Sequence, residues 1–197
     1  RSGTIRNSAA PLPLFRRLRV ALFSTGDELV MPGEPLPPGA IYNSNRYVLR
    51  GLLAALGCQV FDLGIVPDSL EATRAALRAA AGSNDLIVTS GGVSMGEEDH
   101  IKPAVSAEGR LDSWLVAFGR INDPAGGPGA AFIGLPGNPV SSFVTFIMLV
   151  RPFVLRAQGV ANCLPKAIPL SAAFDWPRPD RRREFLRAQI AEDGRVV

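Results

Sequence analysis

Apolar residues in this chain fall partly in short continuous runs and partly at helical spacing, which together indicate an α/β protein. The continuous runs predict strands at 18–24, 59–66, 85–89, 111–118 and 130–134. Apolar positions at helical spacing predict helices between them, at 44–56, 68–81, 99–108 and 140–156. This alternation predicts a doubly wound, mostly parallel sheet with helices on both faces.

The regions outside the predicted sheet differ in character from it. Residues 1–17 show no clear period, so we interpret them as a tag, a linker or a remnant of preceding domains. Residues 18–159 form the predicted α/β domain. In residues 160–197 repeated prolines exclude long helices, and strands are predicted at 166–174 and 184–191. We therefore expect the chain to end in an incomplete C-terminal β domain.

Three of the predicted strands end in small, polar loops that contain glycine. The loops are Ser-Thr-Gly-Asp-Glu-Leu at 24–29, Thr-Ser-Gly-Gly-Val-Ser-Met-Gly-Glu-Glu-Asp at 89–99 and Leu-Pro-Gly-Asn-Pro at 135–139. In an open parallel sheet these carboxyl ends lie along one edge, where ligands bind. Bare backbone N–H groups and small side chains suit phosphate or a pterin-like anion. The alternative for the second loop is a Gly-rich turn in which Asp99 caps the next helix.

Charged and capping residues extend this picture. Glu97, Glu98 and Asp99 would repel a bare anion, but Mg²⁺ can bridge carboxylate and phosphate oxygens. After the third loop, Asn138 suits a helix N-cap and Pro139 the first turn. The N-terminus of that helix, with Ser141 beside it, is expected to bind an anion.

Composition narrows the class of protein. The chain has 197 residues, 47% of them hydrophobic, and a formal net charge of +3 that comes from nineteen arginines and two lysines. Genome composition explains the arginines most simply, although guanidinium also suits oxyanions. The arginine run 181–183 lacks the interleaved aromatic residues that are typical of nucleic-acid-binding proteins, so no nucleic-acid binding is expected.

Cellular setting is inferred from what the sequence lacks. Two cysteines, Cys58 and Cys163, are not enough for a disulfide framework or a metal cluster. We expect both side chains to be buried as small hydrophobic residues. No apolar run is expected to span a membrane, and no signal peptide opens the chain. A reducing, cytoplasmic location is therefore expected.

Four motifs carry a family resemblance. Ser-Thr-Gly-Asp-Glu-Leu at 24–29, Ile-Tyr-Asn-Ser-Asn at 41–45, Ser-Gly-Gly-Val-Ser at 90–94 with Asp99, and Gly-Leu-Pro-Gly-Asn-Pro-Val-Ser at 134–141 occur in the order of the MoeA family. The match covers about residues 16–159. The resemblance implies a MoaB/MogA-like α/β domain and an enzyme of molybdenum cofactor biosynthesis, a molybdopterin molybdenumtransferase. Such enzymes use Mg²⁺ to insert molybdate into adenylated molybdopterin and release AMP.

The resemblance also implies roles for individual residues. Asp99, with Glu28 or Asp27, would act in catalysis, and Asp99 and Glu28 would hold the metal. Molybdate would lie near Ser141 and arginines of the run 182–187. Tyr42 would shape the substrate edge, while His100 has no expected catalytic role. The substrate-binding residues would be Thr25, Gly26, Asn43, Asn45, Ser90, Gly91, Gly92, Ser94, Pro136, Gly137, Asn138, Ser141, Arg183 and Arg187.

Two departures from the family pattern stand out. MoeA proteins carry N-terminal domains that this sequence does not show. The family also has a Lys-Pro-Gly-Lys-Pro loop where Ala117 runs directly into Phe118. The loop is either deleted or a mobile segment omitted from this sequence, and we favour omission because ligand loops are often mobile. With a true deletion, oxyanion binding and activity would both be in doubt.

Partners and alternatives complete the expectations. The resemblance implies a homodimer, with contacts to an adenylyltransferase and to acceptor molybdoenzymes. Molybdopterin adenylyltransferases share the fold but tend to carry Thr-Gly-Gly-Thr-Gly in place of 90–94, so they come second. A non-enzymatic pterin-binding or clustering scaffold, like part of gephyrin, is the third hypothesis. The acids Asp27, Glu28 and Asp99 argue against a scaffold, which needs no metal site.

Overall fold

The central element of the computed structural model is a six-stranded sheet of order β4-β1-β5-β8-β7-β6. The structure describes residues 15–92, 100–113, 117–178 and 184–197. Strands β1, β4, β5 and β8 are parallel, and β7 is antiparallel to both of its neighbours. The bounds are β1 Arg19–Thr25, β4 Gln59–Val66, β5 Leu86–Ser90, β6 Gly109–Ser113, β7 Phe118–Ile121 and β8 Ala130–Leu135.

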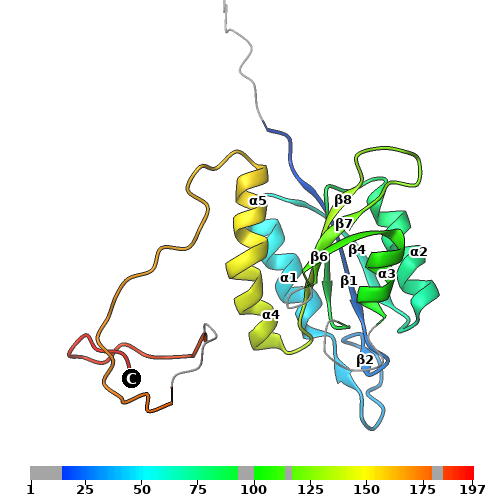
Figure 1. Ribbon diagram of the computed structural model, residues 1–197. Coiled ribbons are helices and arrows are strands. Elements are labelled where there is room, and N and C mark those ends of the chain that lie inside the picture. Colours follow the sequence, from blue (N-terminus) through cyan, green and yellow to red (C-terminus); the bar gives the residue numbers. More distant parts are fainter. Residues whose placement is uncertain (1–14, 93–99, 114–116, 179–183) are drawn as a thin grey trace, which may run out of the picture.

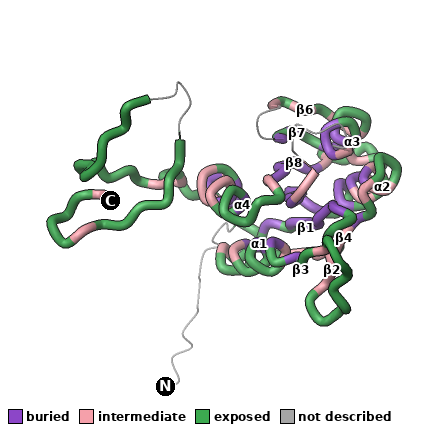
Figure 2. The backbone as a smooth tube through the Cα atoms, turned by 90° about the horizontal axis from the view of Figure 1, so that it is seen from below, coloured by how far each residue is buried: buried purple, intermediate pink, exposed green. Residues whose placement is uncertain are grey.

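Helices cover both faces of this sheet, as the sequence predicts (Figure 1). On one face lie α1 (Ser44–Ala55) and a helical stretch of α4 (Pro139–Thr145), the π-helical turn η1 (Phe146–Val150) and α5 (Arg151–Ala157). On the other face lie α2 (Leu70–Ala81) and α3 (Ile101–Glu108). Each face has its own apolar core, and the buried residues gather between sheet and helices (Figure 2). The doubly wound, mostly parallel fold is confirmed.

The helix ends show why these segments fold as they do. Asn43 caps α1 by accepting from the backbone N–H of Arg46, and Gly57 follows the helix with a φ of 77°. Ser69 caps α2 by accepting from the N–H of Ala72. The helix predicted to begin at residue 68 therefore begins two residues later, at Leu70.

Three strand predictions are wrong. The strand expected at 111–118 is two antiparallel strands, because Ser113 of β6 pairs with Phe118 of β7. The strands expected at 166–174 and 184–191 are not formed in the described residues there, which show isolated bridges of Ala172 and Ile190 to Val196. A strand needs a paired neighbour and an apolar face to bury, and this segment runs away from the sheet (Figure 1).

The structure adds a small element that the sequence analysis does not predict. Strands β2 (Leu29–Val30) and β3 (Ile41–Tyr42) pair in parallel next to the carboxyl edge of the main sheet. Each has two residues, which is too short for a period of alternation to be recognised. Leu29 of β2 and Ile41 and Tyr42 of β3 form one side of the site described below.

The helical stretch Pro139–Ala157 corrects two expectations. It has 19 residues and a mean hydropathy of 1.6, so by length and composition it could cross a membrane. The expectation that no apolar run is long enough is therefore wrong. The stretch packs on the sheet through Phe146, Val150 and Val154. It is not buried all round, since Val140 and Phe143 are each 46% exposed.

Candidate functional site

The three Gly-containing loops lie side by side at one edge of the sheet. β5 pairs with β1 on one side, through Ser24 and Ser90, and with β8 on the other, through Ser90 and Leu135. From β1 the chain first forms β4 and then crosses back to β5, with α1 and α2 on opposite faces. In such sheets the crevice at the carboxyl ends, where the strand order reverses, is where ligands bind. The expected juxtaposition is confirmed.

Two adjoining hollows open at this edge. The first has a volume of about 260 Å³ and the second about 390 Å³. They share five residues, Thr25, Glu28, Gly91, Gly137 and Asn138. Together they reach the size usual for a small-molecule site. The other lining residues of the first are Leu29, Ile41, Tyr42, Asn43, Ser44, Asn45, Ser90 and Pro139, and those of the second are Gly26, Asp68, Gly92 and Pro136.

Most of the residues predicted from the sequence lie here. Asp27 and Ser141 are exposed beside the hollows without lining them, and Arg187 is exposed on the C-terminal segment. Ser94, Asp99 and Arg183 lie outside the described residues, so their roles stay predictions. The residues brought together are Thr25, Gly26, Glu28, Asn43, Asn45, Ser90, Gly91, Gly92, Pro136, Gly137 and Asn138.

Close packing between the first two loops explains the paired glycines. Gly91 has a φ of 93°, and a Cβ added there would strike the carbonyl oxygen of Thr25. Gly92 has a φ of 63°, and its Cβ would lie 2.7 Å from the side-chain oxygen of Thr25. Both positions therefore require glycine for backbone reasons. The Thr25 hydroxyl is buried without a hydrogen-bond partner among the described residues.

Two asparagines organise the helix starts at the site. Asn138 Oδ1 accepts from the N–H groups of Val140 and Ser141 at 3.0 and 3.1 Å. These N–H groups were expected to face an anion, and they are instead used by the cap. Asn43 Oδ1 accepts from the Arg46 N–H at 3.2 Å and from the Ser24 hydroxyl at 3.4 Å. Its Nδ2 is buried without a partner among the described residues.

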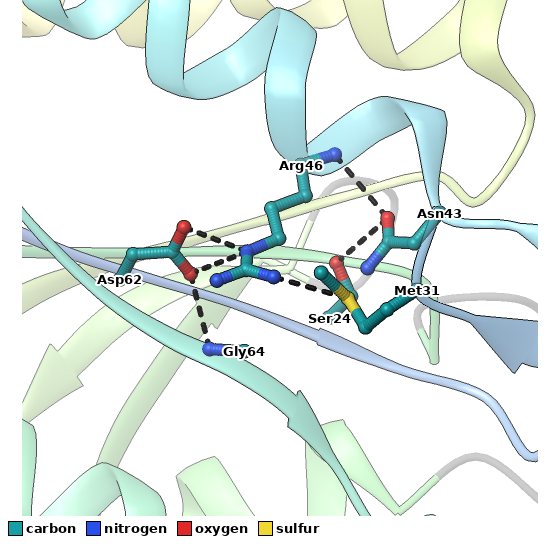
Figure 3. Close-up of polar contacts among 6 residues, drawn as sticks. All are labelled: Ser24, Met31, Asn43, Arg46, Asp62 and Gly64. Carbon is teal, nitrogen blue, oxygen red and sulfur yellow. Dashed lines mark hydrogen bonds and ion pairs between the residues drawn. The ribbon is translucent and has the colours of Figure 1, made fainter. Parts of the chain in front are cut away.

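A polar network holds the wall of the first hollow (Figure 3). Arg46 Nε donates to both carboxylate oxygens of Asp62 on β4, at 2.8 and 2.6 Å. The guanidinium also donates to Met31 Sδ at 3.0 Å, next to β2. Asp62 further accepts from the Gly64 N–H at 3.0 Å. Arg46 thus connects α1, β4 and the β2–β3 segment that forms one side of the hollow.

Two carboxylates line the second hollow. The carboxylate of Glu28 folds back over Gly26, 2.6 Å from where a Cβ on that glycine would lie. Asp68 follows β4, so it also lies at the carboxyl end of a parallel strand. Sequence reasoning missed Asp68, because only the sheet order brings the end of β4 to the same edge as the ends of β1 and β5. No group of three potential metal ligands occurs within the described parts of the chain.

A comparison with protein families identifies this arrangement. The model for a probable molybdopterin binding domain matches residues 21–156, which include β1 through most of α5. The chain belongs to this family. The match confirms the resemblance drawn from the four sequence motifs.

Individual relatives of this molybdopterin-binding domain carry the expected name. The molybdopterin molybdenumtransferase of Haemophilus influenzae is 42% identical over 198 residues, covering 95% of this chain and 48% of the relative. Molybdopterin molybdenumtransferase 2 of Mycobacterium tuberculosis is 36% identical over the same length and coverage. The chain therefore spans about half the length of the curated relatives it matches.

Solved structures agree with the fold of the molybdopterin-binding domain. The chain resembles the molybdopterin biosynthesis MoeA protein of Pyrococcus horikoshii with a TM-score of 0.64 and 32% identity, covering 74% of this chain and 37% of that one. It also resembles the molybdopterin biosynthesis enzyme MoaB from Thermus thermophilus with a TM-score of 0.51, covering 72% and 97%. At 18% identity the second likeness shows the fold alone.

Proposed function

We propose that this chain is the molybdopterin-binding part of a molybdopterin molybdenumtransferase, which inserts molybdate into adenylated molybdopterin and releases AMP. The observation that carries the proposal is the pair of hollows at the carboxyl edge, formed by residues of all four family motifs. The names of the relatives support the same reaction. Backbone groups of the loops after β1, β5 and β8 would hold the pterin and its phosphate.

Magnesium fits the oxygen donors of the second hollow. Mg²⁺ takes one or two carboxylates together with substrate phosphate oxygens, and Glu28 and Asp68 line this hollow beside the Thr25 hydroxyl. Asp99, outside the described residues, remains the third predicted acid, while Asp27 is exposed outside both hollows. When bound, the ion would neutralise charge on the phosphoanhydride and on the departing AMP. Glu28 and Asp68 would fix its place beside the phosphate loops.

The molybdate position is the least complete part of the site. Ser141 lies one turn into α4, and the predicted arginines 183 and 187 belong to the C-terminal segment. The family's lysine loop has no counterpart, because residues 114–117 alone connect the paired Ser113 and Phe118 in the full sequence. The interpretation of an omitted loop is therefore wrong. Molybdate would instead depend on hydroxyl, amide and guanidinium donors.

The assembly proposed for the whole protein is a cytoplasmic homodimer. Its partners would be an adenylyltransferase that supplies the substrate and acceptor molybdoenzymes that receive the cofactor. In this proposal the helical stretch Pro139–Ala157 serves as a core helix and not as a membrane anchor, which the packing of Phe146 and Val150 supports. The domain division at 17/18 and 159/160 belongs to the same proposal.

The decisive experiment separates metal insertion from adenylate synthesis. The full-length protein is supplied with adenylated molybdopterin, Mg²⁺ and molybdate, and AMP release is measured with and without molybdate. A second arm supplies molybdopterin, ATP and Mg²⁺ without molybdate, and adenylate formation is measured. The proposal expects molybdate-dependent AMP release and no adenylate. Adenylate made at a catalytic rate would move the protein to the adenylyltransferases, and pterin binding without either reaction would indicate a scaffold.

A further inference from the structure

Asn45 occupies a central position among the loops of the site. It is the second residue of α1 and is buried, with 9% of its surface exposed. Its Nδ2 donates to Ser90 Oγ at 3.2 Å and to the carbonyl oxygen of Gly137 at 2.8 Å. Ser90 ends β5, and Gly137 follows β8. One side-chain amide therefore connects the helix after the β2–β3 segment with two of the three Gly-containing loops.

The orientation of this amide follows from its partners. A backbone carbonyl accepts hydrogen bonds and cannot donate, so the atom that faces Gly137 must be the amide nitrogen. That nitrogen carries two hydrogens, and the two bonds use both. The amide nitrogen of Asn45 thus has no hydrogen left for a ligand.

The loops after β5 and β8, which Asn45 joins, approach each other between the two hollows. Gly91 and Gly137 line both of them, and a Cβ on Gly137 would lie 3.7 Å from the Gly91 Cα. The backbone holds the base of the gap between these loops, since the Gly91 N–H donates to the Leu135 carbonyl at 3.1 Å. Beyond that bond, the loop containing Gly137 is tied to β5 through Asn45.

We infer that Asn45 is a positioning residue, which sets the separation of the loops after β5 and β8 and so the width of the pterin site. This inference rests on the proposed function for the identity of the ligand, but not for the hydrogen bonds themselves. It assigns Asn45 a different task from the direct substrate contact that the family motif predicts. The residue would act by holding Ser90 and Gly137 at a fixed spacing.

A substitution to aspartate tests this role with almost no change of shape. Asn45→Asp replaces the donor by a carboxylate that repels the Gly137 carbonyl, whereas the protonated carboxyl can donate one hydrogen bond again. Asn84→Asp is the matched control, because Asn84 is also buried and donates through Nδ2 to the Ala80 carbonyl and to Ser83. Asn84 lies in the turn before β5 and lines neither hollow.

The first measurement needs no ligand. Amide hydrogen exchange is followed in the full-length protein for the segments 88–92 and 134–140, at pH 8 and at pH 5.5. In Asn45→Asp both segments should exchange faster than wild type at pH 8 and approach the wild-type pattern at pH 5.5, because burial beside a carbonyl oxygen raises the pKa of the introduced carboxyl well above its ordinary value. In Asn84→Asp they should match wild type at both values. Unchanged exchange in Asn45→Asp, or equal loosening in Asn84→Asp, would overturn the inference.

The second measurement uses adenylated molybdopterin as the probe. The affinity of each variant is divided by that of wild type at the same pH, so that pH effects shared by all the proteins do not enter the comparison; the ionisable side chains that line the first hollow are Glu28 and Tyr42. For Asn45→Asp the affinity should be lower by about ten-fold or more at pH 8, the size expected when a buried acceptor loses its donor, and should recover at low pH. Equal affinity at every pH would contradict the inference.

Two further outcomes are separated by this design. If wild type does not bind the probe, the proposed function fails, while hydrogen exchange still decides the role of Asn45. If Asn45→Asp does not fold, Asn45→Ala removes the same bonds without adding a charge. Asn45→Ala should then loosen both segments and lower the affinity at all pH values, and wild-type behaviour would overturn the inference.

Discussion

Gly91 and Gly92 illustrate how backbone and ligand requirements coincide at single residues. Their positive φ values and their contact with Thr25 require glycine even without a ligand. The same absence of side chains brings the backbone to the surface of the hollows, where Gly91 lines both and Gly92 lines the second. The sequence therefore could not separate a turn from an anion-binding loop at these positions. Their place beside the Thr25 hydroxyl, which has no described partner, favours the binding loop.

Asp99 carries the main prediction about a single residue. It lies outside the described residues, so its role rests on its place after a Gly-rich loop of the family motif. Asp99→Asn should lower AMP release from adenylated molybdopterin more than about a hundred-fold, because an amide loses the charge that a divalent ion needs. The free energy of unfolding should change by less than about 1 kcal/mol. Turnover at the wild-type rate would remove Asp99 from the mechanism.

Some of the site residues can be predicted from neighbouring residues in the sequence, whereas others depend on the tertiary arrangement. Glycines, Asn43 and Asn138 follow from loop and cap chemistry, and all of them line the hollows. Asp68 was missed because its signal is tertiary, namely the arrival of β4 at the same edge. The role of Ser141 stays a prediction, and its backbone N–H is already used by the Asn138 cap, which a family motif does not show.

Among the elements, α1 is joined to β4 by the Arg46–Asp62 ion pair, in addition to the packing of Leu49 and Leu53 in the core. Arg46 and Asp62 are 19% and 12% exposed at their side chains, so the pair is largely shielded from water. Asp62→Asn leaves the guanidinium without a carboxylate partner and should lower the free energy of unfolding by about 2 kcal/mol, measured with urea. Asp112→Asn, at the exposed pair with Arg110, is the control and should have little effect. An equal decrease in the free energy of unfolding in both variants would show that the buried pair stabilises the fold no more than the exposed pair does.

A second ion pair attaches the segment before β1 to the start of β5. Hydrogen bonds from Arg16 lower the pKa of Asp85, and the Arg19 backbone N–H acts in the same direction against partial desolvation. A carboxyl with a lowered folded-state pKa stabilises the fold above its unfolded value of about 3.9, and this contribution is lost as the pH falls through the folded pKa.

Substitution of this carboxyl gives a pH-dependent prediction. Asp85→Asn should lower the urea midpoint at pH 7, and the difference from wild type should shrink as the pH is lowered below about 4. Added salt should also reduce the difference, because Arg16 is mostly exposed. A difference that stays constant with pH would show that the charge of Asp85 does not stabilise the fold.

The long helical stretch shows where periodicity stops being informative. Its limits were predicted within one residue, because the Asn138-Pro139 start is a local signal. The π-helical turn at 146–150 was not predicted. Pro152 has no N–H to donate, and just before it the Arg151 N–H bonds to the Phe146 carbonyl five residues back. The β6–β7 hairpin was likewise missed, because the residues 114–117 between its strands are apolar in sequence and carry no turn signal.

For the whole molecule, the apolar surface suggests that further protein surface covers this chain. Leu164 and Ile168 in the C-terminal segment are 73% and 77% exposed, and Val140 and Phe143 are exposed on α4. The relatives are about twice as long as the chain. The strands predicted after residue 160 failed here because their pairing partners do not lie in the described residues.

The homodimer is the prediction at this scale. Exposed apolar side chains on α4 favour association, and the family resemblance implies an active site between subunits. Sedimentation equilibrium of the full-length protein at micromolar concentration should give twice the mass of one chain. A species with the mass of one chain throughout the concentration range would contradict the prediction.

The account as a whole depends on the two hollows being the pterin site, and Gly137 tests this directly. It lines both hollows, its φ is not positive, and a Cβ there would meet Gly91 at an ordinary contact distance of 3.7 Å. Gly137→Ala should therefore fold normally while narrowing the site. Gly51→Ala is the control, because Gly51 is exposed on α1 with open space around it. That change should raise the free energy of unfolding by about 0.5–1 kcal/mol.

The measurement is the affinity of the full-length protein for adenylated molybdopterin in wild type and both variants. The account predicts that Gly137→Ala weakens binding by about ten-fold or more with a nearly unchanged free energy of unfolding. Gly51→Ala should bind as wild type does. Wild-type affinity in Gly137→Ala would contradict the account and place the pterin elsewhere.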